Sequence, residues 1–390
     1  MTEGKYDFDT PVERRGSDSF KWAIGENEIP MWVADMDFKA APEIINALEK
    51  RLSHPVYGYI RIPDEWYLSY INWWKTRHGF TMEKEWLTFC YGVIPALSSI
   101  VKSLSEPGQK VLLQPPVYNH FYNSIRNNSR IVFESPLVYR DGAYEIDFKD
   151  LEEKMADPDT PLMILSNPQN PVGKIWDAET LSRIGELAKK HNVVVLSDEI
   201  HCDITEPGCS YVPFAGVSNI CRTLSVTCIA PTKAFNLAGI KSAAVMVPNT
   251  DLRKRIFEGL SRDEIDEPNI LSCPAAIAAF NEGGDWLDEL CEYISENRKF
   301  TAEFVEKELP GLHLVKGEAT YLLGLDVSSL NLMSRELSSR LRKNAGVYFS
   351  PGADYGERSG AFLRLNVACP RSQLKEALQR LKEGIARLHP

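Results

Sequence analysis

Apolar residues follow two patterns that alternate between about residue 85 and residue 250. Short runs that are apolar almost throughout predict buried strands, because a strand covered on both faces has no polar side. Residues 178–191 instead repeat apolar side chains at helical spacing, which predicts a crossover helix between parallel strands. The expected strands cover residues 87–91, 110–114, 161–166, 193–197, 223–227 and 242–247. This alternation predicts an α/β fold with a mostly parallel sheet between helices.

The pattern changes after about residue 274. A long helical stretch runs through Trp286, Leu290, Ile294 and Phe304, and strand candidates follow at 320–327 and 361–367. Helical patterns at 334–343 and 373–388 complete a smaller α+β region, whereas the first forty residues are irregular. We therefore expect an N-terminal arm at 1–40 that packs with the small domain, a large domain at 41–285 and a small C-terminal domain at 286–390.

Composition narrows the class of protein. The 390 residues are 44% hydrophobic and 25% charged, which is typical of a soluble protein with a large core. A net charge of -10 disfavours a nucleic-acid partner, and neither a membrane span nor a signal peptide is apparent. The eight cysteines form no Cys-x-x-Cys pair, so we expect reduced thiols in a cytoplasmic protein and no metal site.

Three polar residues follow expected strands in a chemically suggestive order: Asn170, Asp198 and Lys233. A partly desolvated lysine amine can hold the aldehyde of pyridoxal phosphate (PLP) covalently. A carboxylate can keep the pyridine nitrogen protonated, and an amide can donate to the ring oxygen. Taken singly, each has an ordinary explanation: a surface lysine, a turn-capping aspartate and a plain Asn-Pro turn. Together they predict a PLP site at the strand ends, where open sheets bind ligands.

Further residues suit parts of such a site. The expected helix after Gly92 begins with Val93 and Ile94, and free backbone N–H groups at a helix start favour phosphate, although glycine before a helix is common. Tyr118 suits stacking on a flat ring but equally suits a core. Arg364 lies within an apolar strand pattern, where it predicts either a two-pronged grip on a carboxylate or an internal salt bridge.

These residues resemble the fold-type I PLP enzymes, the aspartate aminotransferase superfamily, over nearly the whole chain. The resemblance implies a mostly parallel sheet of the seven-stranded type in a large PLP-binding domain, and a homodimer. It also implies a role for each matching position: Lys233 as the lysine that binds the cofactor, Asp198 at the pyridine nitrogen, Asn170 at the ring oxygen, Tyr118 stacked on the ring, Val93 and Ile94 at the phosphate, Arg364 at the substrate carboxylate, and Tyr59 at the phosphate of the neighbouring subunit.

Three segments are similar to the cystathionine β-lyase and C–S lyase subgroup: Trp32 to Phe38, Asp198 to His201, and Lys233 to Asn236. His201 stands where typical aminotransferases carry tyrosine, so the resemblance places it beside the cofactor. Two positions depart from the broader family, which often has serine three residues before the lysine and arginine eight residues after it. Here these are Ala230, which has no hydroxyl, and Lys241, which supplies a point charge but no planar fork.

The subgroup resemblance implies β-elimination of sulfur from L-cystathionine or related cysteine S-conjugates, giving pyruvate, ammonia and a thiol. Lys233 would then remove the α-proton as general base. An aminotransferase acting on an amino acid and a keto acid uses the same central residues and is the alternative. A PLP-binding regulatory protein that acts through protein contacts is a second alternative, although the segment before residue 40 is too short and acidic for a DNA-binding domain.

Overall fold

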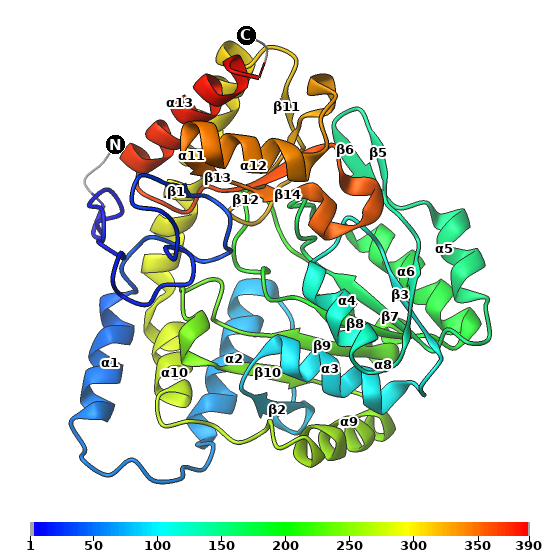
Figure 1. Ribbon diagram of the computed structural model, residues 1–390. Helices are drawn as coiled ribbons and strands as arrows, with labels where there is room; N and C mark the ends of the chain where they lie inside the picture. Colours follow the sequence, from blue (N-terminus) through cyan, green and yellow to red (C-terminus); the bar gives the residue numbers. More distant parts are fainter. Residues whose placement is uncertain (1–3, 389–390) are drawn as a thin grey trace.

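A computed structural model describes residues 4–388 (Figure 1). Its central element is a seven-stranded sheet with the order β2-β10-β9-β8-β7-β3-β4. Strands β9, β8, β7, β3 and β4 are parallel, whereas β10 is antiparallel to both of its neighbours. These strands are β2 (Leu87–Cys90), β3 (Lys110–Leu113), β4 (Ile131–Glu134), β7 (Leu162–Ser166), β8 (Val194–Asp198), β9 (Ser225–Ile229) and β10 (Ala243–Met246). The mostly parallel sheet agrees with the sequence prediction.

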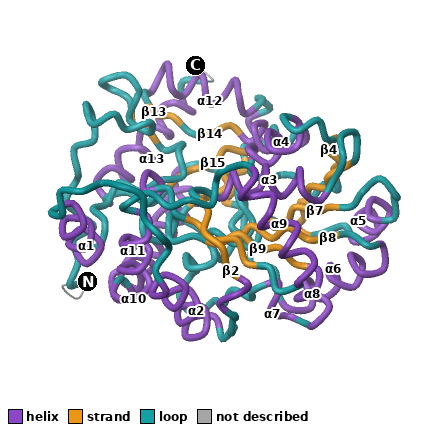
Figure 2. Tube along the Cα trace, turned by 90° about the horizontal axis from the view of Figure 1, so that it is seen from below, coloured by secondary structure: helices purple, strands orange, loops and turns teal. Residues whose placement is uncertain are grey.

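Helices cover both faces of this sheet (Figure 2). In β3, Val111 and Leu113 pack into the cluster that includes helices α3, α4 and α9, whereas Leu112 between them packs into the cluster on the opposite face. This alternation explains the continuous apolar runs, because both faces are buried. The helices around the sheet are α1 (Pro42–Leu52), α2 (Asp64–His78), α3 (Val93–Leu104), α4 (Asn119–Arg126), α5 (Phe148–Met155), α6 (Ala178–His191), α7 (Phe214–Val217), α8 (Asn219–Leu224), α9 (Thr250–Arg262) and α10 (Ser272–Glu282).

A second sheet, of four strands, has the order β11-β12-β15-β14 and forms the smaller part of the molecule. The N-terminal segment packs in the same part of the molecule, because β1 (Ile29–Pro30) pairs in parallel with β13 (Val347–Tyr348) in a separate two-stranded sheet. The strands of the sheet are β11 (His313–Leu314), β12 (Leu322–Asp326), β14 (Ser350–Pro351) and β15 (Phe362–Asn366), and its helices are α11 (Gly284–Glu308), α12 (Ser334–Ala345) and α13 (Arg371–Ala386). The domain bounds at residues 40 and 285 stay a prediction.

One expected strand needs correction, and three strands between residues 131 and 145 were not expected. The strand expected at 223–227 begins at Ser225, because residues 219–224 form helix α8, whose first turn is capped by Ser218 Oγ accepting from the backbone N–H of Cys221. The edge strand β4 and the hairpin of β5 (Val138–Arg140) and β6 (Ala143–Glu145) were not predicted. In β4, Ile131 is exposed and the other residues are half-buried, so the apolar run that marks the central strands is missing.

Within residues 4–388, no helix combines the length and the apolar character needed to cross a bilayer.

Candidate active site

A cavity of about 220 Å³ opens at the carboxyl ends of the central strands. The parallel strands β7 and β8 end in register, with Ser166 beside Asp198, so the segments that follow these two strands start at the same edge of the sheet. The cavity is lined by eight residues singled out in the sequence: Val93, Ile94, Tyr118, Asn170, Asp198, His201, Lys233 and Lys241. Arg364 joins them by donating from Nη1 to Asn170 Oδ1 at 3.3 Å. Tyr59 lies apart and is fully exposed.

Lys233 lies in the turn that follows β9, with its amine inside the protein. Its Nζ donates to the backbone oxygen of Ala34 at 2.5 Å. Burial is the main cause that lowers the pKa of Lys233 to about 8, and the nearby Arg364 charge adds to it. The amine is therefore neutral in a far larger fraction of molecules at neutral pH than an exposed lysine, which favours attack on a carbonyl carbon.

Asp198 is the last residue of β8 and is buried. Its Oδ1 accepts from the backbone N–H of Ile200 at 3.2 Å, so it also caps the following turn. Burial raises the pKa of this carboxyl to about 7, with the Lys233 charge opposing the rise only in part. A buried carboxylate whose negative charge is only partly balanced would be stabilised by a cationic ligand atom, such as a protonated pyridine nitrogen.

His201 follows in the same turn and is buried beside the cavity. Burial first, then the charges of Lys233 and Arg364, lower its pKa to about 3, so the imidazole is neutral. Its Nδ1 has no hydrogen-bond partner among the described residues. A buried ring nitrogen left without a partner fits a ligand group in the cavity.

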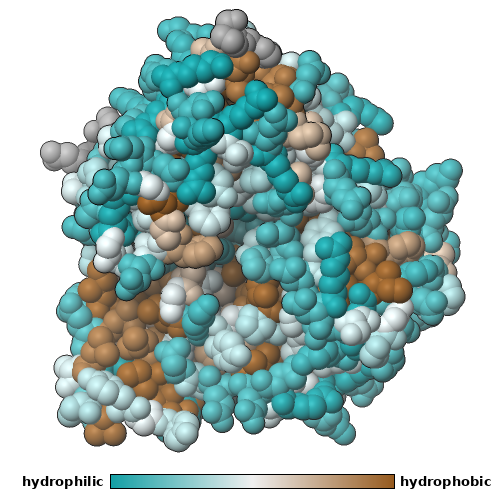
Figure 3. All heavy atoms as spheres, in the orientation of Figure 1, coloured by the Kyte–Doolittle hydropathy of each residue, from teal (hydrophilic) through white to brown (hydrophobic). Residues whose placement is uncertain are grey.

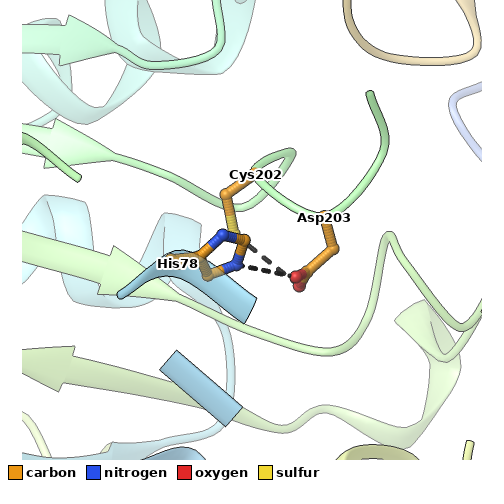
Figure 4. A group of neighbouring side chains, drawn as sticks. All are labelled: His78, Cys202 and Asp203. Carbon is orange, nitrogen blue, oxygen red and sulfur yellow. Dashed lines mark hydrogen bonds and ion pairs between the residues drawn. The ribbon is translucent and has the colours of Figure 1, made fainter. Parts of the chain in front are cut away.

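A polar cluster behind this turn fixes its position (Figure 4). His78 Nε2 lies 2.9 Å from Asp203 Oδ1, which also accepts from Trp73 Nε1 at 2.8 Å. Cys202 Sγ lies 3.6 Å from the other carboxylate oxygen of Asp203. These contacts tie the end of α2 to Asp203, two residues after His201, and so hold one end of the turn that carries His201.

The start of α3 forms another wall of the cavity. Gly92 provides no side-chain cap, so the first N–H groups of the helix, at Val93 and Ile94, have no acceptor within the helix. Lys241 lines the same end of the cavity, whereas Ala230 is buried and adds no hydroxyl. Free helix N–H groups beside a lysine suit a phosphate, so the donors here fit the phosphate of PLP despite the two departures.

Arg364 lies in β15, in the second sheet, and extends toward the cavity. Its Nη2 donates to the backbone oxygen of Trp32 at 2.7 Å, and the guanidinium lies 4.8 Å from the centre of the Tyr355 ring. Its Nε has no partner, and within residues 4–388 no carboxylate forms an ion pair with it. The internal salt bridge considered from the sequence is therefore wrong, and the guanidinium keeps hydrogen-bonding capacity for a ligand carboxylate.

Tyr118 stands at the N-cap of α4, where its backbone leads the chain from β3 back to the cavity. Burial raises its pKa to about 12, so its hydroxyl keeps its proton at neutral pH. The ring packs against Phe121, with centroids 5.8 Å apart. Tyr118 is thus a partly buried wall of the cavity that packs against the hydrophobic cluster behind it.

Sequence reasoning missed the contribution of the N-terminal segment to this cavity. Ala34 lines it, and Tyr321 Oη donates to the Ala34 oxygen at 3.1 Å. Thr232 and Ser166 are further lining residues. The backbone oxygen of Ala34 has no signature in the sequence, and Tyr321 falls in an apolar strand pattern that is explained by core packing alone.

The family model for aminotransferase class I and II matches residues 22–381. The chain belongs to this family. It is 41% identical over 385 residues to cystathionine beta-lyase PatB of Bacillus subtilis (strain 168), covering 97% of this chain and 100% of the relative. The family therefore accounts for the whole arrangement of the two sheets and the cavity.

Two solved structures share the fold at similar identity. Cystalysin from Treponema denticola, described as containing a pyridoxal 5'-phosphate cofactor, has a TM-score of 0.94 at 31% identity, with 98% and 99% of the two chains covered. The PLP-bound C-S lyase from Staphylococcus hominis has a TM-score of 0.92 at 32% identity, with the same coverage. These findings confirm the resemblance to fold-type I PLP enzymes and to the C–S lyase subgroup of the family.

Proposed function

We propose that this member of the aminotransferase class I and II family is a PLP-dependent carbon–sulfur β-lyase. Its substrates would be L-cystathionine or related cysteine S-conjugates, and its products pyruvate, ammonia and a thiol. The observation that carries the proposal is that Lys233 and Asp198 line one cavity and that Arg364 donates to Asn170 in the wall of the same cavity. The 41% identity to a named cystathionine beta-lyase supports elimination as the reaction.

Different residues of the cavity would bind different parts of the cofactor. Lys233 would hold its aldehyde carbon, and Asp198 would keep its ring nitrogen protonated. Asn170 and His201 line the same cavity and would bind the ring oxygen, and Tyr118 would lie on the face of the ring. The start of α3 and Lys241 would bind its phosphate. When bound, PLP supplies an electron sink that stabilises negative charge at Cα of an amino acid.

The protein residues then handle the substrate. Arg364 would hold the α-carboxylate by two hydrogen bonds, which orients the bonds at Cα. Lys233, with its pKa lowered to about 8 by burial, is suited to take the α-proton near neutral pH. Because His201 and Tyr118 are neutral, they place no opposing charge beside the Arg364 guanidinium or the Lys233 base.

Transamination is the second candidate, because the family itself is named for it. The two reactions diverge only after the α-proton has left, so the same residues serve both. The decisive experiment supplies purified enzyme with L-cystathionine and no keto acid. The lyase releases pyruvate and homocysteine in equal amounts, whereas strict dependence on an added keto acid would establish an aminotransferase.

We also propose a homodimer in which Tyr59 reaches the phosphate site of the neighbouring subunit. Leu52, at the end of α1, and Val56, Tyr57 and Tyr59, in the loop that follows it, are exposed. Figure 3 shows apolar side chains gathered at the lower left, on the side where Figure 1 places α1. An exposed group of large apolar side chains is a feature of protein interfaces. The cysteines are free thiols, which supports a cytoplasmic location.

A further inference from the structure

A short N-terminal segment, residues 32–36, crosses the gap between the two sheets and borders the cavity; we call it the strap. The second sheet holds it through side chains that donate to its backbone oxygens. Arg364 Nη2 donates to the Trp32 oxygen at 2.7 Å. Asn366 Nδ2 donates to the oxygens of Val33 and Asp35, at 2.6 and 2.5 Å. The strap is thus fixed on both sides of Ala34.

The large sheet holds the same strap through Asn236. Its Oδ1 accepts from the backbone N–H of Met36 at 3.0 Å, and its Nδ2 donates to the Met36 oxygen at 3.0 Å. Asn236 lies three residues after Lys233, so the strap and the lysine turn are braced to one another. Arg14 further pairs with the carboxylate of Asp35 at 2.9 Å. These contacts hold the strap on either side of Ala34, but none of them involves the Ala34 oxygen itself.

The backbone oxygen of Ala34 is the atom of the strap that contacts the Lys233 amine. It accepts from two donors, Lys233 Nζ at 2.5 Å and Tyr321 Oη at 3.1 Å. Within residues 4–388, this oxygen is the hydrogen-bond acceptor of the Lys233 amine. Tyr321 is buried, and its hydroxyl makes no other hydrogen bond there. A buried hydroxyl normally requires a partner, so its placement on this oxygen is costly to disturb.

We propose that Tyr321 is a positioning residue for Lys233: by donating to the Ala34 oxygen it sets where the lysine amine points. An amine that gives one N–H to a fixed acceptor keeps its lone pair in a fixed direction, and proton removal from Cα depends on that direction. The inference rests on the proposed function, because it assigns Lys233 as the base. It adds a residue that touches neither substrate nor cofactor and acts through the backbone of the strap.

The simple alternative is that Tyr321 only fills core space. Its ring is buried in the main hydrophobic cluster, and phenylalanine would fill that space equally well. Tyr321→Phe therefore separates the two explanations, because it removes one oxygen and leaves the ring. Tyr144→Phe is the matched control, since Tyr144 is also buried but lies in the β5–β6 hairpin, in a different hydrophobic cluster.

The first measurement uses the protein without cofactor or substrate. Reductive methylation of Lys233 is followed against pH by mass spectrometry of its peptide, which gives the midpoint at which the amine becomes reactive. The Tyr321 hydroxyl and the Lys233 amine share one acceptor oxygen, so removing the hydroxyl leaves that oxygen to the amine alone and favours its charged form. Tyr321→Phe is therefore expected to raise the midpoint by about 0.5 to 1 pH unit, with no change in Tyr144→Phe. An unchanged midpoint in Tyr321→Phe would overturn the proposal.

The second measurement uses the PLP-loaded enzyme and L-alanine in deuterated water. Alanine has no leaving group at Cβ, so exchange of its α-hydrogen, followed by NMR, reports proton transfer alone. Tyr321→Phe is expected to slow saturated exchange about tenfold while the half-saturating alanine concentration stays the same, because Arg364 is untouched. Equal exchange rates in the variant and the parent enzyme would refute the positioning role.

The two measurements also separate this proposal from the proposed function. A parent enzyme that fails to exchange the α-hydrogen would contradict the function assigned to Lys233, and the methylation midpoint would still decide the role of Tyr321. Asn366→Ala provides an independent check, since it frees the oxygens of Val33 and Asp35 while leaving Tyr321 and Lys233 intact. It should slow α-hydrogen exchange as Tyr321→Phe does. Normal exchange in both variants would contradict the proposal that the strap positions the Lys233 amine.

Discussion

Arg364 and Asn170 lie 194 positions apart in the sequence, yet Arg364 Nη1 donates to Asn170 Oδ1 at 3.3 Å. The contact joins β15 of the second sheet to the loop after β7 of the first. It places a guanidinium with a free Nε against Asn170, a residue of the cavity that Lys233 also lines. A substrate carboxylate bound there would stand beside the lysine amine, which is the geometry that α-proton removal needs.

Arg364→Ala should therefore weaken binding of every α-amino acid substrate. Truncating one member of a buried, hydrogen-bonded charge pair costs roughly 2–5 kcal/mol, so KM should rise by about 30-fold or more. Steady-state kinetics on two substrates with different side chains would measure this, and the factor should be similar for both. Arg335→Ala, which removes an exposed partner of Asp354, is the control. A normal KM in Arg364→Ala would mean that the arginine is structural.

Asp198→Asn keeps the shape of the side chain and its capping of the Ile200 N–H, but removes the negative charge. We expect the variant to retain PLP and to lose kcat by about 10²–10³-fold, the scale of a lost electrostatic contact in a buried site. Asp203→Asn, in the cluster behind the same turn, should lower the melting temperature while changing kcat little. Comparable losses of kcat in both variants would show that Asp198 acts only on the fold of the turn.

The pH dependence of cofactor capture follows from the pKa of Lys233, which burial lowers from 10.5 to about 8. Only the neutral amine attacks an aldehyde, so the rate constant for PLP binding to the cofactor-free protein should rise with pH, reach half of its maximum near pH 8 and level off above about pH 9. Stopped-flow absorbance across pH 6 to 10 measures it. A rate that keeps climbing past pH 9.5, as for an ordinary exposed lysine, would be incompatible with the buried amine.

Tyr59 offers a test of the dimer. Tyr59→Phe should weaken PLP binding, measured by equilibrium titration, because a phosphate contact across the interface is lost. Tyr57→Phe is the control, since the Tyr57 hydroxyl donates to Leu52 of its own chain. Mixed dimers sharpen the test: a Lys233→Ala subunit with an intact Tyr59 should restore normal PLP affinity to the site of a Tyr59→Phe partner. Failure of the mixture to restore it would place Tyr59 outside the site.

The central strands and the cavity residues were predictable because each has a local signal. Residues 162–166 and 194–198 form strands buried on both faces, and the apolar runs at these positions predict them. Asp198 ends one of these strands and Lys233 follows β9, so the rule that ligands bind at strand ends predicts that the two residues lie together.

The remaining parts of the site depend on contacts that no local pattern encodes. The Ala34 oxygen is a backbone atom that every residue possesses, and only the fold brings it within 2.5 Å of Lys233 Nζ. The start of β9 was misplaced because the helix at 219–224 is decided by the Ser218 cap rather than by its apolar content. The exposed edge strand β4 lacks the double-sided burial that identifies its neighbours.

The central claim is that Lys233 is the residue that binds the cofactor, and borohydride trapping tests it most directly. The PLP-loaded protein is reduced, digested and analysed by mass spectrometry. The reduced cofactor should be found on the peptide that contains Lys233, and a Lys233→Ala protein should carry none and show no visible absorbance from bound PLP. Cofactor attached to another lysine, or a Lys233→Ala enzyme that still binds PLP covalently and turns over substrate, would contradict the account.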